Sequence, residues 1–325
     1  MADFSGKFVI SLDFELLWGV MDIKNNEAYN ENLLGVHTAM PKMLQLFEKY
    51  NIDATFATVG FLFAKDKDEL FQYLPKKTPS YHNKDLSPYE SGIKYMQNNP
   101  IDDKLYFARD LVDLLKSKKN HEIACHTFSH YYCLEAGQSN DEFKEDIKTA
   151  IEIAKDQGVS LDSIVFPRNQ CNNDYLQVIE DSGMTSFRGT ETAWYYNPST
   201  KINLPKTAKM LRLLDSYINI SGHNTYLIPG LAKSFPFNIP SSRFLRPHVP
   251  ILMLFNALKL KRIKKSMTFA AKNNEVYHLW WHPHNFGTNQ NENFLFLEQI
   301  LIHYQALNKK YRHYPIKCVS YKSRV

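Results

Sequence analysis

The chain has 325 residues, of which 44% are hydrophobic and 22% are charged. These values are those of an ordinary globular protein, so they exclude a disordered chain and leave room for one large α/β domain or two smaller ones. The formal net charge of +5 at pH 7 falls short of the concentrated basic surface that nucleic-acid binding requires, so nucleic acid is excluded as a partner.

Strands and helices alternate in the first half of the chain. The short apolar run from Lys7 to Asp13 predicts a buried strand, and residues 33–50 have apolar positions at helical spacing, interrupted by Pro41. The elements expected next are a strand at 53–60, a helix at 103–119, a strand within 121–130, a helix at 140–157, a strand at 163–167 and a helix at 173–183. Such alternation predicts parallel βαβ units.

Two segments interrupt this alternation. Residues 65–103 are polar and contain four prolines, and residues 189–274 contain seven prolines with weak periodicity, so both are expected to be insertions or long loops. Regular structure is expected again in a strand at 276–284 and a helix that ends near residue 309. We therefore predict a single domain over residues 1–325, an α/β fold in which seven or eight mostly parallel strands form a distorted barrel with a large irregular insertion.

The cysteines and the hydropathy pattern indicate the compartment. Cys125, Cys133, Cys171 and Cys318 show no CxxC spacing and no disulfide-framework density, so we expect free thiols in a reducing environment. The first residues lack the basic and apolar regions of a secretion signal, and no stretch has the roughly 18 consecutive apolar residues of a spanning helix. We therefore expect a cytoplasmic protein.

The first predicted strand ends in two carboxylates. In α/β barrels the reactive residues lie at the carboxyl ends of the strands, and period-two alternation puts Asp13 and Glu15 on one face. Two carboxylates this close repel each other unless a cation lies nearby, which points to a metal or an arginine. Taken alone, an acidic strand end exposed to water explains the pair better.

The third and the last predicted strands end in histidines. His126 and His130 stand at i and i+4, a spacing that puts both on one face of a helical turn and lets them share a cation. HxxxH alone is common by chance, but beside the carboxylate pair it predicts a two-histidine, one-carboxylate site. At the last strand, Pro283 cannot continue an interior ladder, so His282 is expected at the strand end and His284 in the loop. His278 lies deeper, and we interpret it as a core histidine.

Together these motifs resemble those of the polysaccharide deacetylase family, also called the NodB-homology domain or carbohydrate esterase family 4. The matching segments are SLDFE, DATFATVG, HTFSH, FPRNQ and LWWHPHN, and the resemblance covers most of the chain. The family's typical domain is a distorted barrel of parallel strands with a divalent metal, usually zinc, at its mouth.

The resemblance assigns roles by position. The metal ligands would be Glu15, His126 and His130, which implies a divalent ion, most simply Zn²⁺. The catalytic residues would be Asp13 as the general base, Arg168 as the brace of that base and His282 as the general acid. Candidates for contact with the substrate are Trp18, Asn169, His284 and Asn285.

Three motifs depart from the family pattern. The acids of the first motif are two residues apart instead of adjacent, which resembles the intracellular and allantoinase-like branches more than the secreted deacetylases. The third motif lacks the usual arginine-proline-proline order. The fourth motif, an aspartate near a tryptophan that tunes the acid histidine, has no clear counterpart, because Trp194 has no aspartate beside it and Asp215 is a distant candidate.

The expected activity is removal of an acetyl or formyl group from the nitrogen of an amino sugar. Without a secretion signal, the expected substrate is a nucleotide-linked or lipid-linked precursor of a cell-surface polysaccharide. The alternatives are an allantoinase-like amidohydrolase acting on a small ureide, a non-haem Fe(II) oxygenase and a non-catalytic glycan-binding barrel. The oxygenase uses the same ligand set but leaves Asp13, Arg168 and His282 without a role.

Residues 251–272 combine an apolar cluster with five basic residues, Lys259, Lys261, Arg262, Lys264 and Lys265. A helix of this kind could rest on a membrane that contains anionic lipids. The opposing interpretation, which the composition favours, is a helix packed on the barrel by its apolar face with its lysines in solvent.

Overall fold

The structure is a computed structural model that describes residues 7–23, 26–200, 205–227, 235–312 and 314–316. Three of the four cysteines lie in this part of the chain, and all three are free thiols. Cys318 lies outside the described residues.

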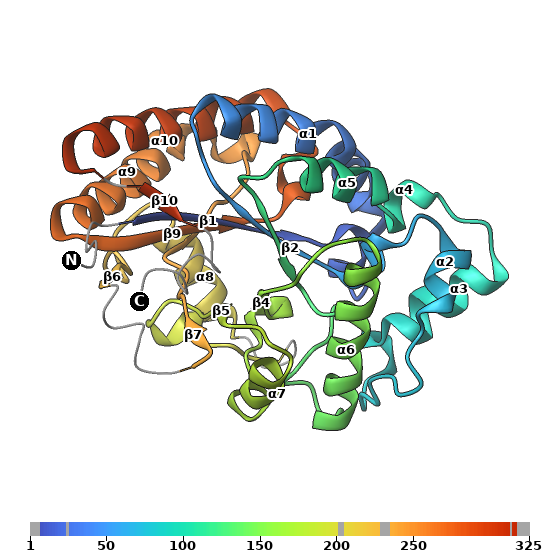
Figure 1. Ribbon diagram of the computed structural model, residues 1–325. Coiled ribbons are helices and arrows are strands. Elements are labelled where there is room, and N and C mark those ends of the chain that lie inside the picture. The colour runs from blue at the N-terminus through green and yellow to red at the C-terminus, as the bar shows by residue number, and fades with distance from the viewer. Residues whose placement is uncertain (1–6, 24–25, 201–204, 228–234, 313, 317–325) are drawn as a thin grey trace.

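One curved sheet forms the centre of the molecule (Figure 1), and ten strands of the described residues belong to it. Its central strands run in the order β9-β1-β2-β3-β4-β5, and all their pairings are parallel. Their bounds are β1 Lys7–Phe14, β2 Thr55–Thr58, β3 Glu122–Cys125, β4 Ser163–Val165, β5 Ser186–Arg188 and β9 Glu275–Trp281. The predicted barrel of mostly parallel strands is thus confirmed.

An extended segment joins the two edges of this sheet. It contains β7 (Phe237–Asn238) and β8 (Arg243–Phe244), with Pro240 between them. The backbone N–H groups of residues 237, 239 and 241 bond to the carbonyls of residues 185, 187 and 189, whereas those of 242 and 245 bond to 278 and 280. Since the segment changes partner from β5 to β9, it bridges the gap that would otherwise leave the barrel open. The edges also carry β6 (Tyr226–Leu227), antiparallel to β9, and β10 (Tyr314–Ile316), parallel to β1.

Alternation along β1 separates the interior of the barrel from the layer beneath the helices. Phe8, Ile10, Leu12 and Phe14 belong to the large core between sheet and helices. Val9 packs instead against Ile239 and Val276 inside the barrel. Period two therefore carries Ser11 and Asp13 to the same interior face, one above the other toward the carboxyl end.

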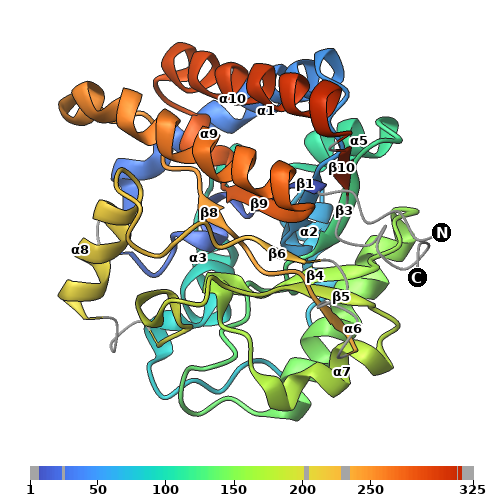
Figure 2. The same cartoon turned by 90° about the vertical axis from the view of Figure 1, so that its left-hand side faces the viewer.

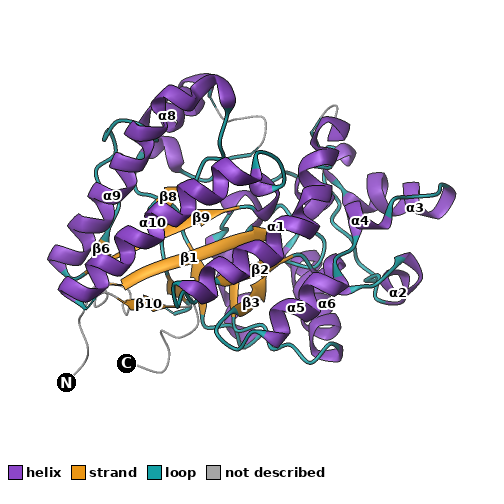
Figure 3. Ribbon diagram, turned by 90° about the horizontal axis from the view of Figure 1, so that it is seen from above, coloured by secondary structure: helices purple, strands orange, loops and turns teal. Residues whose placement is uncertain are grey.

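Helices surround the sheet, as Figure 3 shows from above. They are α1 Asn30–Lys49, α2 Lys67–Gln72, α3 Lys94–Asn98, α4 Asp103–Tyr106, α5 Arg109–Ser117, α6 Asn140–Asp156, α7 Leu176–Asp181, α8 Lys206–Asp215, α9 Asn256–Asn273 and α10 Gln290–Tyr311. The helix predicted at 103–119 is divided into α4 and α5. The two expected insertions contain regular elements: α2 and α3 lie in 65–103, and α8, α9 and three short strands lie in 189–274.

Helix α9 lies beside α10 and over β9 (Figure 2). Its buried residues include Ile263, Met267 and Ala270, so the packed interpretation of this helix is the one that the structure shows. Lys259 and Arg262 are also buried, however, which differs from the expectation that all its cations reach solvent. No helix in the described part of the chain is long and apolar enough to cross a membrane.

Candidate active site

The carboxyl end of β1 places two buried carboxylates at the mouth of the barrel. Asp13 is the last interior residue of β1, and Glu15 follows the strand where the chain enters a short 3-10 helix. Both side chains are almost completely buried. Burial alone would raise the pKa of Glu15, but His282, His126 and His130 hold it well below its usual value. Both carboxylates therefore need the positive or hydrogen-bonding partners that surround them.

The loop after β3 carries His126 and His130. It was expected to be a helical turn, but Thr127 and His130 have left-handed backbone angles, with φ of 61° and 58°. Asp146 of α6 holds this loop, because its carboxylate accepts the backbone N–H groups of Phe128 and Ser129 and the Ser129 hydroxyl. A left-handed β-branched residue is strained, and such strain persists only where the surroundings impose it.

Glu15 and the two histidines meet at one point. Glu15 Oε2 lies 3.2 Å from His126 Nε2 and 3.1 Å from His130 Nε2. His126 Nδ1 lies 2.7 Å from the Val165 carbonyl oxygen, and only the nitrogen can donate in that contact. A neutral His126 therefore turns the lone pair of Nε2 toward the Glu15 carboxylate. Two facing lone pairs repel unless a cation lies between them, so this donor set fits a divalent metal ion.

A second group of possible ligands shares the same carboxylate. Ligand atoms of Glu15, His282 and His284 lie within 4.8 Å of one another, as do those of Glu15, His126 and His130. Burial, together with the neighbouring His282, lowers the pKa of His284 to about 3, so this ring is neutral at physiological pH. Zinc-type ions prefer neutral imidazole and carboxylate ligands, which both groups supply.

Arg188, at the end of β5, holds Asp13. Its guanidinium donates Nη1–H to Asp13 Oδ1 at 2.6 Å and Nη2–H to Oδ2 at 2.7 Å, a bidentate ion pair. The same group donates to Ser11 and Asn169, and it stacks over the Trp280 ring at 4.2 Å. Burial would raise the pKa of Asp13, but Arg188 keeps it below its usual value. Asp13 is therefore a carboxylate throughout the neutral range.

The sequence prediction for the brace of Asp13 was therefore wrong. Arg168 was expected to hold the base, but its Nη2 donates to Asp22 and its guanidinium lies over the Tyr132 ring. Consecutive left-handed angles at Arg168 and Asn169 turn the chain so that Asn169, and not the arginine, meets Arg188. Arg188 was missed because the three-residue strand β5 was not predicted; Gly189, directly after it, is the one signal that could have indicated a strand end.

His282 enters the site from the end of β9. Its Nε2 lies 3.5 Å from Glu15 Oε1 and 3.9 Å from Asp13 Oδ2, and its side chain is 22% exposed. On the other side of the ring, Nδ1 lies 3.4 Å from Asn285 Oδ1, and the His284 ring stacks on it at 4.8 Å. Asn285 is thus the side chain that contacts the outer nitrogen of this histidine. Asp215 is bound elsewhere, by Arg243 and Arg262.

Two other predicted residues are located by burial. His278 is completely buried and contacts Ser11 Oγ through Nε2 at 2.7 Å, as expected of a core histidine. Trp18 was a candidate for substrate contact, but it is 2% exposed and its indole N–H donates to the Tyr106 carbonyl. Its edge-on packing against Phe61 places it in the core, so it is not available to a substrate.

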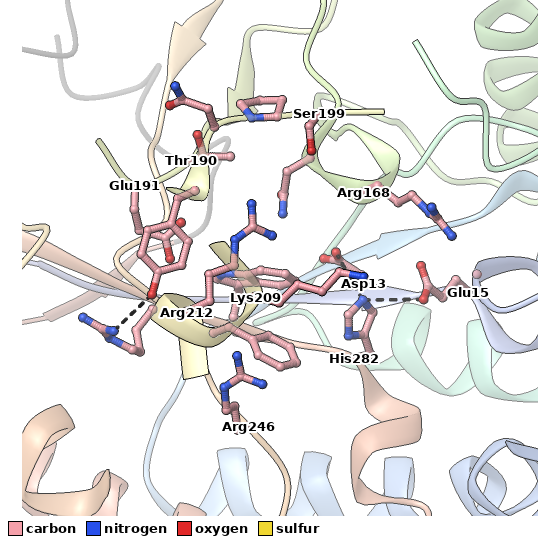
Figure 4. Close-up of a pocket in the computed structure, with 18 of the residues that line it drawn as sticks. Asp13, Glu15, Arg168, Thr190, Glu191, Ser199, Lys209, Arg212, Arg246 and His282 are labelled. Carbon is pink, nitrogen blue, oxygen red and sulfur yellow. Dashed lines mark hydrogen bonds and ion pairs between the residues drawn. The ribbon is translucent and has the colours of Figure 1, made fainter. Parts of the chain in front are cut away.

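A cavity of about 530 Å³ opens over these residues. Figure 4 shows Asp13, Glu15 and His282 close together on one side of the cavity, and many of the other lining residues come from the 189–246 region. Asn169 also lines the cavity. A buried carboxylate with two or three imidazoles, a second carboxylate fixed by arginine and a partly exposed histidine thus share one space, an arrangement suited to hydrolysis.

Comparisons with known proteins agree with this description. Residues 29–187 match the family model described as polysaccharide deacetylase. Among solved structures, the chain is similar to one described as a "putative polysaccharide deacetylase" from Mycobacterium smegmatis, with 12% identity, a TM-score of 0.59 and coverage of 98% of this chain and 91% of that one. It is also similar to Puue allantoinase, with 10% identity, a TM-score of 0.55 and coverage of 99% of this chain and 91% of that one. A third similar structure is a probable polysaccharide deacetylase from Pseudomonas aeruginosa PAO1, with 11% identity, a TM-score of 0.50 and coverage of 92% of this chain and 84% of that one. No curated protein matches the sequence.

The matched span is 159 of the 325 residues, just under half of the chain, so this part of the chain resembles the polysaccharide deacetylase family, and the solved structures share the fold. The family match supports a hydrolase that removes acetyl groups from a carbohydrate. The matched span contains His126 and His130 but not Asp13, Glu15, Arg188 or His282. These four residues join the site only through the barrel fold, in which β1, β5 and β9 end at the same mouth.

Proposed function

We propose that this protein is a metal-dependent hydrolase that removes an acetyl or formyl group from the nitrogen of an amino sugar. One observation carries the proposal: Glu15 faces the Nε2 atoms of His126, His130 and His282 at 3.1–3.5 Å, while a separate carboxylate, Asp13, is fixed by Arg188 beside them. Amide hydrolysis needs an activated water, a stabilised oxyanion and a proton for the leaving amine, and these groups can divide that work.

Glu15, His126 and His130 would hold the metal ion, for which we propose Zn²⁺. When bound, such an ion lowers the pKa of water to about 7 and polarises the acyl carbonyl. The Val165 carbonyl supports this assignment, because it fixes the tautomer and the ring orientation of His126.

Asp13 would accept the proton of the attacking water. The bidentate contact with Arg188 keeps both carboxylate oxygens in place, so that the base is oriented before the substrate arrives. Ser11 and Asn169 accept further hydrogen bonds from the same guanidinium, and together they restrict its position.

His282 would donate a proton to the leaving nitrogen. Asn285 Oδ1 can accept the Nδ1–H of the ring, which leaves Nε2 directed to the side where Glu15 and Asp13 lie. Its partial exposure gives it access to the cavity. General acid catalysis of this kind is typically worth about a hundredfold or more in rate.

The proposed substrate is a nucleotide-linked or lipid-linked precursor of a cell-surface polysaccharide, used by a cytoplasmic enzyme. A cavity of about 530 Å³ exceeds the needs of a small ureide, which supports a sugar over the allantoinase-like alternative. The Asp13–Arg188 pair and His282 have no role in an Fe(II) oxygenase or a glycan-binding barrel, and this favours hydrolysis over both.

Peripheral contact with an anionic membrane through residues 251–272 belongs to the same proposal. Helix α9 packs on the barrel, but the 3-10 helix before it, Pro250–Phe255, contains no buried residue. Ile251 is 86% exposed and Leu254 is 83% exposed, while Lys261 and Lys265 of α9 are also exposed. Apolar residues with adjacent cations suit the surface of a membrane that contains anionic lipids.

The function is tested by incubating the metal-loaded protein with N-acetyl and N-formyl amino sugars, as free sugars and as nucleotide conjugates, and measuring released acetate and formate. We expect release by the wild type and a loss of at least about a hundredfold in Asp13→Asn, which cannot accept the proton, with the metal content unchanged. The matched control is Asp113→Asn, which neutralises an exposed aspartate on α5 and should retain activity. Turnover by Asp13→Asn near the wild-type rate would require another general base.

A further inference from the structure

Two arginines on the wall of the catalytic cavity form no ion pair with a carboxylate in the described part of the chain. Arg212 lies on α8, and Arg246 follows β8; both line the cavity together with the catalytic residues (Figure 4). Among the residues that the structure describes, neither guanidinium forms an ion pair with a carboxylate, whereas Arg109, Arg168, Arg188, Arg243 and Arg262 all do. Two arginines without an ion pair beside an active site suit an anionic ligand.

Each of these arginines is held by its Nε–H and by an aromatic ring. Arg212 Nε donates to the Tyr195 carbonyl, and its guanidinium lies over the Tyr196 ring at 5.6 Å. Arg246 Nε donates to Ser216 Oγ at 2.7 Å, and its guanidinium lies over the Phe244 ring at 5.9 Å. These contacts fix both side chains without using the terminal Nη groups. The two forks are therefore oriented in advance of ligand binding.

Of the two acids nearby, Asp215 is paired with other arginines, and Glu191 forms no ion pair with Arg212 or Arg246. Asp215 accepts from Arg243 Nη1 at 2.6 Å and forms a longer ion pair with Arg262 at 3.5 Å. Glu191 also lines the cavity and accepts from Ser241; it lies within electrostatic range of both Arg212 and Arg243, so a single carboxylate faces several cations. Arg212, Arg246 and the exposed Lys209 thus leave this wall of the cavity with excess positive charge.

We infer that Arg212 and Arg246 form an anion subsite that binds a phosphate group attached to the sugar substrate. This inference deepens the proposed function and rests on it for the identity of the sugar. Two guanidinium groups with free Nη donors match the several oxygens and the double charge of a phosphate ester or diphosphate better than a single carboxylate, which one bidentate arginine would satisfy. The phosphate would hold the substrate at one end while the N-acyl group lies over Glu15.

Exposed apolar residues beside the subsite indicate which group is attached to the phosphate. Met210, Leu213 and Leu214 of α8 are exposed beside Arg212, and Tyr217 packs on Phe255 of the exposed 3-10 helix at 5.8 Å. An apolar surface next to a phosphate site fits a lipid carrier. A nucleotide would present the same phosphate chemistry, so the experiment separates the two sources.

The test measures binding of inorganic diphosphate to the metal-loaded protein by calorimetry. We expect the Kd to rise at least about tenfold in Arg212→Gln/Arg246→Gln, because the two charged forks are lost. The matched control is Lys144→Gln/Lys148→Gln, which removes the same charge from the exposed face of α6 and should leave the Kd unchanged. Since a bound metal contributes equally in all of these proteins, the difference reports on the arginines alone.

The conservative variant Arg212→Lys/Arg246→Lys is the control for misfolding. It keeps the charge and should retain part of the diphosphate affinity, whereas a general structural defect would abolish binding in both arginine variants and lower the melting temperature. Wild-type protein that does not bind diphosphate, or a glutamine variant with the wild-type Kd, would overturn the inference.

The same proteins are then compared with N-acetylglucosamine, its 1-phosphate and N-acetylmuramic acid. Wild type should prefer the 1-phosphate over the neutral sugar at least about tenfold, and the glutamine variant should lose this preference. An equal preference for the carboxylate-bearing sugar would contradict the phosphate assignment. Tighter binding of a geranyl ester of the 1-phosphate than of the 1-phosphate itself would identify a lipid carrier. Tighter binding of the uridine diphosphate conjugate would identify a nucleotide carrier.

Failure of this inference can be told from failure of the proposed function. Hydrolysis without any preference for phosphate-bearing sugars would support the deacylase function and contradict the anion subsite. If diphosphate binding depends on Arg212 and Arg246 but no N-acyl sugar is hydrolysed, the anion subsite is supported and the deacylase function is contradicted.

Discussion

Glu15 is the residue on which two possible metal sites converge. Its carboxylate can bind a metal ion together with His126 and His130, or together with His282 and His284. If the ion were bound by the second group, His282 would be a metal ligand and could not act as the general acid. The first group has the better support, because the Val165 carbonyl orients His126 and the left-handed angle at His130 turns that residue toward Glu15.

We therefore expect His126→Ala/His130→Ala to lose the metal, because two of three protein ligands are removed. The matched control is His282→Ala/His284→Ala, which should keep about one ion per chain and lose only activity. Elemental analysis of the purified variants measures both. Full occupancy in the first variant and loss in the second would assign the ion to the other pair of histidines.

The identity of the arginine that braces Asp13 is also a question at the scale of single residues. Arg188→Lys retains the charge but cannot form the two parallel hydrogen bonds, so we expect kcat to fall about tenfold to a hundredfold. Arg168→Lys should leave kcat close to that of the wild type, because Arg168 contacts Asp22 and Tyr132 instead. Steady-state kinetics with one N-acyl sugar distinguishes the two; a larger effect of Arg168→Lys would restore the role first expected for it.

At the scale of elements, the loop between β3 and α6 depends on one buried carboxylate. Asp146 binds two backbone N–H groups of this loop, and so connects α6 to the segment that carries both histidines. Burial raises the pKa of Asp146 to about 7, although the bonds from Ser129 and Phe128 act in the opposite direction. The folded protein therefore takes up a proton at this residue at pH values where the unfolded chain has already lost it.

This shift predicts a pH-dependent stability. Between about pH 4 and pH 7 the native state binds one more proton than the unfolded state at Asp146, so its contribution to the free energy of unfolding falls as the pH rises, by at most about 1.4 kcal/mol per pH unit. Asp146→Asn should lack this slope, whereas Asp113→Asn, at an exposed position on α5, should keep it. Urea unfolding at pH 5 and pH 7 measures the difference. Identical slopes in all three proteins would show that Asp146 ionises normally.

At the scale of the whole molecule, positive charge is concentrated in one part of the chain. Residues 192–274 contain thirteen lysines and arginines but a single acidic residue, Asp215, so the remainder of the chain is net negative. The exposed apolar residues of the 3-10 helix Pro250–Phe255 lie in this basic region. One region of the chain thus combines exposed apolar residues with an excess of basic residues.

We expect the protein to sediment with vesicles that contain anionic lipids but not with neutral vesicles, and salt should weaken the binding. Ile251→Ser/Leu254→Ser should reduce it, because each change removes an exposed apolar side chain. The matched control is Leu295→Ser/Ile302→Ser on α10, where the residues are 62% and 53% exposed but lie outside the basic region. Equal recovery in the supernatant with and without anionic vesicles at low salt would exclude membrane contact.

The sequence alone indicated much of the barrel and most of the candidate site. The apolar periodicity of β1, α1, α6 and β9 is strong because each buries a continuous face, and turn residues mark their ends. Asp13, Glu15, His126, His130 and His282 stand at strand ends within short motifs, so they could be identified without coordinates. His278 could likewise be recognised as a core residue from its position along the strand.

Only the tertiary structure showed which partners these residues meet. Arg188 reaches Asp13 across the barrel, 175 positions along the chain, and its strand has three residues, too few for a periodic signal. Likewise, β7 and β8 have two residues each and are stabilised by pairing with β5 and β9, so local sequence cannot reveal them. Trp18 was a candidate for substrate contact because aromatic residues often bind sugars, but its packing against Phe61 buries it in the core. Contacts between distant segments depend on how the strands close into a barrel, and a local pattern carries no information about that closure.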